Sequence, residues 1–155
     1  MKRYTPEEAK NKILHYCAYQ ERSHLEVKKK LYDFGLYSSD VNEIVSFLIN
    51  EGFLNEERFA KAFAGGKFRI KKWGRLKIIR ELENHNLTRN CIRIGMREID
   101  EQDYKKALIE ILKSKSRQIE EKNPLVKRNR VARYAIQKGY EPDIVWKELK
   151  QVIPG

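Results

Sequence analysis

Residues 23–36 read SHLEVKKKLYDFGL and carry both a start signal and a stop signal for one short helix. Ser23 and Glu26 form a capping box, in which each side chain accepts a hydrogen bond from the other residue's backbone N–H. Gly35 stands where helices commonly end in a left-handed residue. The stretch therefore predicts a helix between Ser23 and Gly35.

The segments on either side carry helix signals of the same kind. Thr5-Pro6-Glu7-Glu8 is a second capping box with proline at the first helical position, and it predicts a helix that fades near Tyr19. A third helix is predicted over residues 39–51, with a glycine directly after it. Convincing strand patterns are absent along the sequence. The beginning of the chain is thus predicted to be a group of three helices.

The pattern of this helical group recurs twice further along the chain. A shift of 51 residues superimposes six apolar positions on apolar positions and puts Asn86, which tolerates the left-handed conformation, in the place of Gly35. A shift of 104 residues gives a looser third copy, with Gly139 in that place. Any two amphipathic helices align at some offset, but here two helices and the cap between them agree at one offset. The positions that match between the first two copies are Leu25, Leu31, Leu36, Val41, Val45 and Leu48 with Leu76, Leu82, Leu87, Ile92, Met96 and Ile99.

The repeats predict an all-α fold, a tandem array of three three-helix repeats that is elongated and curved. The expected domains are residues 1–53, 54–99 and 100–155, of which the second and third are basic. Because a unit of this size buries little surface alone, neighbouring units are expected to stack on one another.

The composition points to a cytoplasmic protein with an anionic partner. The chain has 155 residues, of which 41% are hydrophobic and 35% are charged, and its net charge is +11. No apolar segment suits a signal peptide or a membrane span. Cys17 and Cys91 each lie among apolar neighbours, as expected for reduced thiols in a core. A balance this basic favours nucleic acid or a nucleoprotein surface as partner.

The positive charge is concentrated in two zones. Residues 58–80 carry nine basic side chains and no acidic one, and residues 113–155 have a net charge of +6, whereas residues 1–57 have a net charge of −2. A solvated helix face normally mixes both signs, so an all-cationic segment indicates an anionic partner. The candidate filament- or DNA-binding residues are Lys67, Arg69, Lys71, Lys72, Arg75, Lys127, Arg128, Arg130 and Arg133.

Aromatic and glycine residues lie among these cations. Phe63, Phe68, Trp73 and Tyr134 are candidates for stacking on bases, although aromatic residues at helical spacing are more often part of a core. The pair Gly65-Gly66 interrupts a helical pattern, which predicts either a break in the helix or a group that approaches the backbone closely. Trp73-Gly74 is interpreted as the joint between two helices.

Signals for catalysis are poor. His15, His24 and His85 stand alone, without zinc-ligand spacing, and neither a P-loop nor a nucleophile elbow is present. Paired glutamates near helix ends are explained by the helix dipole and by solvation. We expect a protein that is not an enzyme, with no catalytic residues, no metal site and no cofactor.

Four segments, taken in order, resemble the RecX regulatory proteins. Residues 22–35 (RSHLEVKKKLYDFG) are similar to the signature R-S-x-x-E-L-x-x-x-L-x-x-x-G, with Val27 where the signature has leucine. Residues 51–60 (EGFLNEERFA) and 71–82 (KKWGRLKIIREL) resemble the family's G-[FY]-[LI]-[ND] junction and its W-G-x-x-x-I-x-x-x-L segment. Residues 130–140 (RVARYAIQKGY) are similar to R-x-x-x-[FY]-L-x-x-[RK]-G-[FY]. Each motif is weak, but the ordered set covers almost the whole chain.

The resemblance implies a function as well as a fold. RecX proteins are all-helical arrays that bind the RecA recombinase filament on single-stranded DNA and modulate it, usually as inhibitors of ATP hydrolysis and strand exchange. The implied setting is recombination, DNA repair and the SOS response in the cytoplasm, without a cofactor or a membrane. The basic residues above are then expected to contact the filament and its DNA, while the acidic first unit contacts protein.

Two other functions stay open from the sequence. A helix-turn-helix-like DNA-binding protein acting without a recombinase is the main alternative, because helices joined by a tight glycine turn occur in that class. A helical adaptor that never meets nucleic acid is hard to reconcile with residues 58–80. With no long heptad pattern, the protein is expected to be a monomer.

Overall fold

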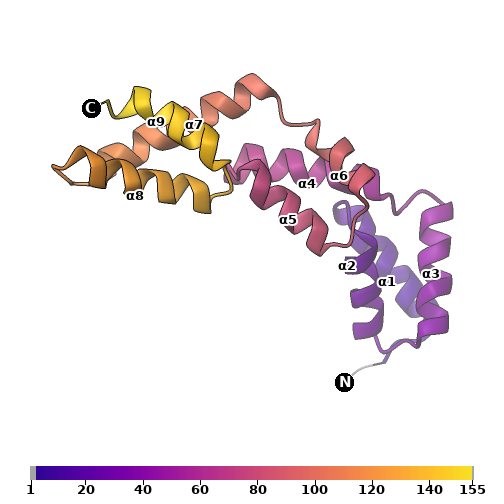
Figure 1. Cartoon of the computed structure of the whole chain (residues 1–155). Helices are drawn as coiled ribbons and strands as arrows, with labels where there is room; N and C mark the ends of the chain where they lie inside the picture. Colours follow the sequence, from indigo (N-terminus) through magenta and orange to yellow (C-terminus); the bar gives the residue numbers. More distant parts are fainter. Residues whose placement is uncertain (1–2, 155) are drawn as a thin grey trace. The chain divides into compact units, whose positions relative to one another are not determined.

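The computed structural model describes residues 3–154, and in that range the chain is helical with no strand (Figure 1). The helices are α1 (Pro6–Tyr19), α2 (His24–Asp33), α3 (Ser38–Asn50), α4 (Glu56–Lys71), α5 (Arg75–Asn84), α6 (Arg89–Met96), α7 (Glu101–Gln118), α8 (Pro124–Gln137) and α9 (Pro142–Val152). The predicted all-α fold class is confirmed.

The helix start signals predicted at Thr5 and Ser23 are confirmed. Both capping boxes form, with the backbone N–H groups of Thr5 and Ser23 each 3.0 Å from a carboxylate oxygen of Glu8 and Glu26. At α4 and α7, the side-chain oxygens of Asn55 and Asp100 accept a first-turn N–H, from Arg58 at 2.9 Å and from Asp103 at 3.0 Å. Short polar side chains therefore satisfy donors that a helix cannot satisfy by itself.

The predicted stop signals are also confirmed. Gly35, Asn86 and Gly139, which the repeat pattern placed at equivalent positions, have φ angles of 88°, 61° and 109°. These values lie in the left-handed region that glycine and asparagine tolerate best. The chain therefore reverses after the second helix of each group in the same way, and the repeat is visible in the backbone as well as in the sequence.

The chain forms two compact units. The N-terminal unit comprises the chain up to Ala62 together with Leu82–Gly95, and the C-terminal unit comprises Phe63–Glu81 together with the chain from Met96 onward. Helices α4, α5 and α6 contribute residues to both units. The three-domain division at 53/54 and 99/100 stays a prediction.

The core of the N-terminal unit lies mainly between α1, α2 and α3. Each of these helices contributes fully buried aliphatic side chains, and truncating one of them to alanine costs about 2–5 kcal/mol. The buried positions include all of the first copy of the apolar repeat except Leu25, which is half-buried. The buried residues of this core are Ala9, Ile13, Val27, Leu31, Leu36, Val41, Ile44, Val45, Leu48 and Leu54.

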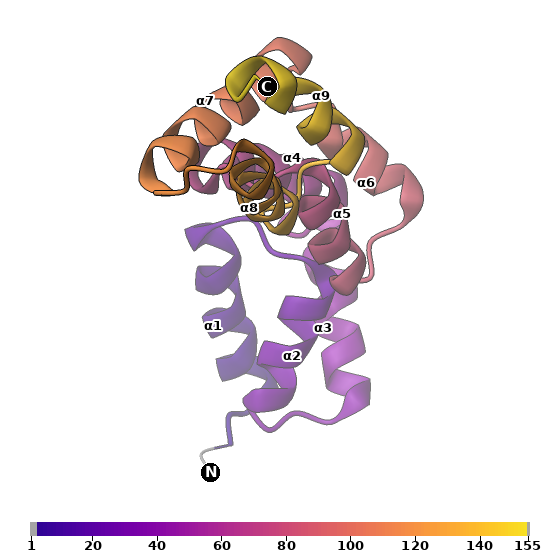
Figure 2. The same cartoon turned by 60° about the vertical axis from the view of Figure 1, so that its left-hand side comes forward.

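The core of the C-terminal unit lies between α7, α8 and α9. Figure 2 views α8 close to its axis, with α7 and α9 on either side of it. The α4 and α5 segments of this unit add Phe68 and Ile78 to the buried set. The buried hydrophobic side chains of the three later helices are Tyr104, Ala107, Leu108, Leu112, Val131, Ala132, Ala135, Val145 and Leu149.

Helix α5 begins against the turn that joins α8 to α9. The backbone N–H groups of Gly74 and Leu76 donate to the carbonyls of Lys138 and Gly139, each at 2.9 Å. A Cβ atom on Gly74 would lie 2.2 Å from the Gly139 carbonyl carbon, so only glycine fits this approach. The predicted joint at Trp73-Gly74 is confirmed, and its glycine has a packing reason.

The Gly65-Gly66 pair does not break α4, which continues to Lys71. The other predicted explanation holds for Gly65, because a Cβ there would lie 2.8 Å from the Arg69 guanidinium. The group that approaches the backbone is therefore a side chain of the same helix, one turn later.

Candidate nucleic-acid interface

The C-terminal unit carries almost all of the net charge. Its residues include 21 basic and 11 acidic side chains, a net charge of +10, which leaves +1 for the rest of the chain. All nine predicted binding residues belong to this unit. A unit with this charge attracts polyanions at long range, and salt weakens that attraction.

Arg75 has a different environment from the other eight predicted residues. Its guanidinium is bonded to Glu101 and, at 2.9 Å, to Glu141, and it lies 4.0 Å from the Tyr104 ring centre. Burial lowers the pKa of Arg75, but the hydrogen bond with Glu101 and the charge of Glu141 outweigh burial and raise it. Because two carboxylates of the same unit balance its charge, Arg75 differs from the exposed cations, and its role in binding stays a prediction.

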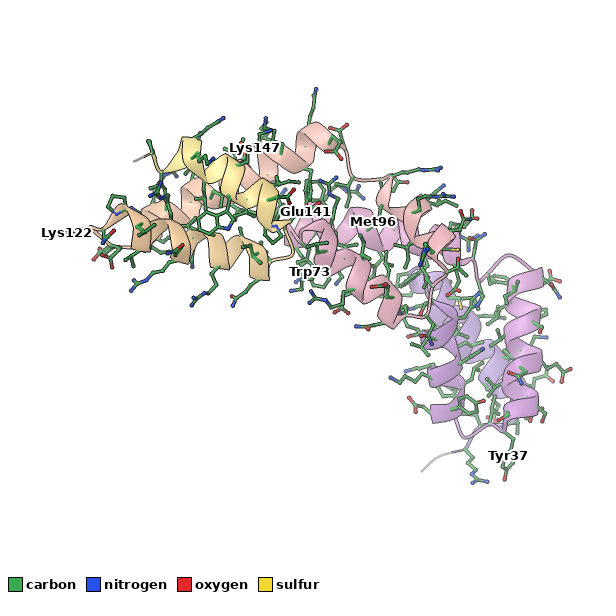
Figure 3. All side chains as sticks on the ribbon, viewed as in Figure 1. Tyr37, Trp73, Met96, Lys122, Glu141 and Lys147 are labelled. Atoms are coloured by element: carbon green, nitrogen blue, oxygen red, sulfur yellow. The ribbon has the colours of Figure 1, made fainter. Side chains whose placement is uncertain are left out.

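Two tyrosines complete this network. The Tyr104 hydroxyl bonds the Glu141 carboxylate and accepts the Arg75 backbone N–H at 2.9 Å. The Tyr104 ring stacks on the Tyr140 ring with centres 4.9 Å apart. Burial raises the pKa of both tyrosines. Figure 3 labels Glu141 at the beginning of α9, where these groups converge.

The other predicted binding residues of the first basic zone lie at the end of α4. Arg69, Lys71 and Lys72 are exposed, and Lys67 is half-buried with its ammonium 4.9 Å from the Trp73 ring centre. Lys77 lies 4.3 Å from the same ring. Two lysines therefore lie over one indole, which indicates that Trp73 positions cations.

The four aromatic residues that are candidates for base stacking differ in how exposed they are. Phe68 is only 5% exposed and packs near the Tyr104 ring, so it belongs to the core. Phe63 and Trp73 are half-buried and contact each other edge to face. Tyr134 is 37% exposed and is the best placed of the four to meet a ligand.

Helix α8 carries the second basic zone. Lys127, Arg130 and Tyr134 follow one another at spacings of three and four, so they share a helix face that also includes Lys138. Arg130 and Arg133 are exposed, whereas Lys127 and Arg128 are half-buried. The only ion pair that involves the predicted α8 residues within 3–154 joins Arg130 to Glu121 at 3.9 Å, a surface distance that contributes little.

Two basic residues of this region were not predicted. Lys115 of α7 and Lys138 at the end of α8 line a hollow together with Lys72 and Tyr134. Lys115 lies between Lys113 and Arg117 and nothing in the sequence distinguishes it from them, while Lys138 lies between Arg133 and Glu141, so no sequence pattern singles out either lysine. Only the packing of α7 on α8 brings them together.

The part of the chain that the structure describes also bears on other classes of site. Among residues 3–154, no group of three or more His, Cys, Asp or Glu side chains is placed to hold a metal ion. None of the described helices combines the length and the apolar character that a membrane span requires.

Comparison with known proteins gives one consistent result. The model of the RecX second three-helix domain matches residues 55–96. The regulatory protein RecX of Clostridioides difficile (strain 630) is 21% identical over 150 residues, which cover 94% of this chain and 68% of that protein. The regulatory protein RecX of Herbaspirillum seropedicae is 28% identical over 87 residues, 56% of this chain and 55% of that protein. The chain thus spans about half to two thirds of the length of these relatives.

Two solved structures share the fold. The crystal structure of RecX from Lactobacillus salivarius has a TM-score of 0.83 at 18% identity, over 95% of this chain and 96% of that one. A crystal structure of a regulatory protein RecX has a TM-score of 0.84 at 16% identity, over 94% of this chain and 71% of that one.

The class that these observations define is an all-α protein of three-helix domains, with one strongly basic unit. The matched second three-helix domain and the two curated relatives agree with the ordered motifs of the sequence. The chain is similar to the RecX regulatory proteins over 94% of its length, and residues 55–96 match their second three-helix domain.

Proposed function

We propose that this protein binds the RecA recombinase filament on single-stranded DNA and inhibits its ATP hydrolysis and strand exchange. Similarity to the RecX regulatory proteins supports the regulatory role. The observation that carries the DNA contact is the net charge of +10 on the C-terminal unit, against +1 on the rest of the chain. The protein acts in this proposal by binding alone, in the cytoplasm, as a monomer without metal or cofactor.

The proposed contact surface consists of predicted cations that no buried carboxylate holds; Arg130 is included because its ion pair with Glu121 is a weak surface contact at 3.9 Å. They come from the end of α4 and from α8, and Arg75 is left out because Glu101 and Glu141 hold it. The N-terminal unit, whose charge is nearly balanced, contacts protein in this proposal. The proposed surface residues are Lys67, Arg69, Lys71, Lys72, Lys127, Arg128, Arg130 and Arg133.

Several weak contacts on one scaffold are sufficient for such a role. A single exposed lysine contributes little to affinity, because solvent and salt screen its charge. When several contacts are made by the same molecule, each later contact forms at a high effective concentration. A filament that repeats the same anionic and protein surfaces therefore binds the whole array much better than any isolated patch does.

The test is the RecA ATPase rate on single-stranded DNA with the protein titrated in at fixed ionic strength. We expect the rate to fall at concentrations well below those that coat naked DNA, which a parallel DNA-binding titration measures. An unchanged rate contradicts the proposal. A rate that falls only when the protein saturates the DNA supports the alternative of a DNA-binding protein that acts without contacting the recombinase.

A further inference from the structure

A hollow in the C-terminal unit lies beside α7 and α8 and has a volume of about 250 Å³. Three lysines line it, each from a different element: Lys72 directly after α4, Lys115 on α7 and Lys138 directly after α8. Tyr134 and Glu110 also line it. The hollow is smaller than the usual pocket for a drug-sized molecule, which suits one compact group.

Tyr134 holds two of the lysines in place. The ammonium of Lys115 lies 4.2 Å from the centre of the Tyr134 ring, and that of Lys138 lies 5.9 Å from it. The ring face attracts cations, so it reduces the freedom of side chains that would otherwise spread into solvent. The backbone of Lys138 is fixed as well, because its carbonyl accepts the Gly74 N–H at 2.9 Å.

Lys72 reaches the hollow from a strained backbone. Its φ angle is 57°, in the left-handed region that a residue with a side chain occupies at an energetic cost. Two hydrogen bonds hold it there: its N–H donates to the Phe68 carbonyl, and its own carbonyl accepts from the Tyr140 hydroxyl, both at 3.0 Å. Strain that the surrounding structure maintains is characteristic of functional positions.

The charges around the hollow are unbalanced. Three lysines and one glutamate, Glu110, line it, and no ion pair of Glu110 within 4.0 Å is found among the described residues. Gathering like charges costs free energy unless an anion joins them. Lysine binds phosphate as a point charge, and several lysines at different angles suit the oxygens of one phosphate group.

A second hollow of about 250 Å³ extends the same surface along α7. It shares Lys72 and Glu110 with the first and adds Arg69 and Lys106, together with the carboxylate of Asp103. Lys106 and Lys115 are nine residues apart on α7, which corresponds to about 13 Å along the helix axis. The two lysines are about half a turn apart around the helix axis, so the hollows are connected by the shared Lys72 and Glu110 and not by a row of cations on α7.

We propose that the first hollow binds one phosphate group of a single-stranded DNA backbone through Lys72, Lys115 and Lys138. This inference rests on the proposed function, since it names the place in the C-terminal unit where the DNA of the filament is held. Tyr134 orients Lys115 and Lys138, and Glu110 opposes the anion.

The first test compares two double variants with the same loss of charge. Lys115→Ala with Lys138→Ala removes two lysines of the hollow, whereas Lys113→Ala with Lys122→Ala removes two exposed lysines outside it. Affinity for a labelled oligothymidine is measured by fluorescence anisotropy over a range of salt concentrations. We expect the first pair to weaken binding roughly tenfold and to reduce the salt slope by about 0.7, the value for one phosphate on a single strand. Equal losses for both pairs overturn the proposal.

Two single variants test the chemistry of the hollow. Lys72→Gly suits the positive φ of this position and removes the lysine side chain, so it should weaken DNA binding severalfold while the unfolding temperature stays close to that of the wild type. Glu110→Gln removes the opposing charge and should strengthen DNA binding. Weaker DNA binding by Glu110→Gln would mean that the carboxylate supports the contact, and it would overturn the proposal.

Further measurements distinguish free phosphate from a DNA phosphate as the ligand of the hollow. They also distinguish failure of the phosphate site from failure of the proposed function. If inorganic phosphate shifts the NMR signals of Tyr134 and oligothymidine does not, the hollow is a site for free phosphate and the DNA assignment is wrong. If Lys115→Ala with Lys138→Ala retains full DNA affinity and still inhibits RecA, the assignment of the hollow as a phosphate site is wrong, while the proposed function remains supported. If the wild-type protein binds DNA through the hollow and leaves RecA unaffected, the proposed function is wrong, while the assignment of the hollow as a phosphate site remains supported.

Discussion

The hydroxyl of Tyr140, in the turn between α8 and α9, donates a 3.0 Å hydrogen bond to the backbone carbonyl of Lys72 at the end of α4. Tyr140 is fully buried and stacks on Tyr104, whose own hydroxyl bonds Glu141. The position of an exposed lysine thus depends on a buried pair of tyrosines. In this unit the core and the candidate anion site are built from the same contacts.

Removing the Tyr140 hydroxyl should affect both stability and binding. Tyr140→Phe keeps the ring on Tyr104 but leaves the Lys72 carbonyl without its donor, which costs about 1 kcal/mol of unfolding free energy. We also expect weaker binding to oligothymidine, because the backbone of Lys72 is no longer held. Urea unfolding and fluorescence anisotropy measure the two effects. Tyr19→Phe, at a tyrosine that is 82% exposed, is the matched control and should change neither.

Arg75 should behave as a structural residue. Arg75→Ala leaves Glu141 and Glu101 without their cation in a partly buried network, so we expect a loss of about 2–3 kcal/mol in unfolding free energy. Lys71→Ala, four residues earlier and exposed, should change the unfolding free energy by less than about 0.5 kcal/mol. Urea unfolding of the two variants checks this contrast. A stable Arg75→Ala protein with reduced DNA affinity would restore Arg75 to the binding surface.

The buried tyrosines predict a loss of stability at alkaline pH. Burial raises the pKa of Tyr104 and of Tyr140 above the ordinary tyrosine value. The unfolded chain releases these protons near pH 10 while the native state keeps them, so the native state binds more protons there. Their contribution to stability is fully present below about pH 10 and is lost as the pH rises toward the folded-state pKa values.

The measurement is the unfolding free energy at pH values from 8 to about 11. For each tyrosine that keeps its proton in the native state, the unfolding free energy falls by about 1.4 kcal/mol per pH unit above pH 10. Tyr140→Phe should therefore show a shallower fall than the wild type, and tyrosinate absorbance of the native protein should lag behind that of the unfolded protein. Parallel curves for the two proteins would show that Tyr140 ionises normally.

Two glycines of the basic zone should respond in opposite ways to alanine. Gly74→Ala places a Cβ 2.2 Å from the Gly139 backbone, so the α8–α9 turn must move, and we expect a loss of about 3 kcal/mol or more. Gly66→Ala meets no atom within 4 Å inside α4, and alanine is the better helix former by about 0.5–1 kcal/mol. Thermal unfolding should thus give a lower midpoint for the first variant and a higher one for the second. Equal midpoints would mean that the close approach at Gly74 relaxes freely.

The features that the sequence could predict are local ones. The Thr5–Glu8 and Ser23–Glu26 capping boxes each lie within four residues, and the left-handed positions at Gly35, Asn86 and Gly139 follow from residue type and offset. Such features need only short-range geometry, so a pattern of residues is sufficient to find them.

The parts of the site that the sequence could not predict depend on distant partners. Arg75 looked equivalent to Lys71 and Lys72 because the partners that neutralise it, Glu101 and Glu141, are 26 and 66 residues away. Local charge density therefore identified the basic unit correctly but could not separate neutralised cations from free ones. For the same reason, the sequence could not distinguish Lys115 from its neighbours Lys113 and Arg117, because only the packing of α7 on α8 places Lys115 beside Tyr134.

Reversing exposed charges on the proposed surface should weaken the effect on RecA more than reversing charges elsewhere. Lys71→Glu with Arg133→Glu changes the net charge by the same amount as Lys28→Glu with Lys29→Glu, and all four side chains are exposed. The first pair lies in the C-terminal unit and the second in the N-terminal unit. We expect the first pair to raise the protein concentration for half-inhibition of the RecA ATPase by roughly tenfold or more, and the second by less than about threefold.

The ionic strength of the assay provides the internal check. The lost contacts are electrostatic, and salt screens them in both proteins. The difference in half-inhibition concentration between the Lys71→Glu, Arg133→Glu variant and the wild type should therefore become smaller as the salt concentration rises. Helical circular dichroism of both variants should match the wild type, since none of the four side chains is buried. If the two pairs raise the half-inhibition concentration equally, net charge rather than the surface of the C-terminal unit controls the interaction with the filament.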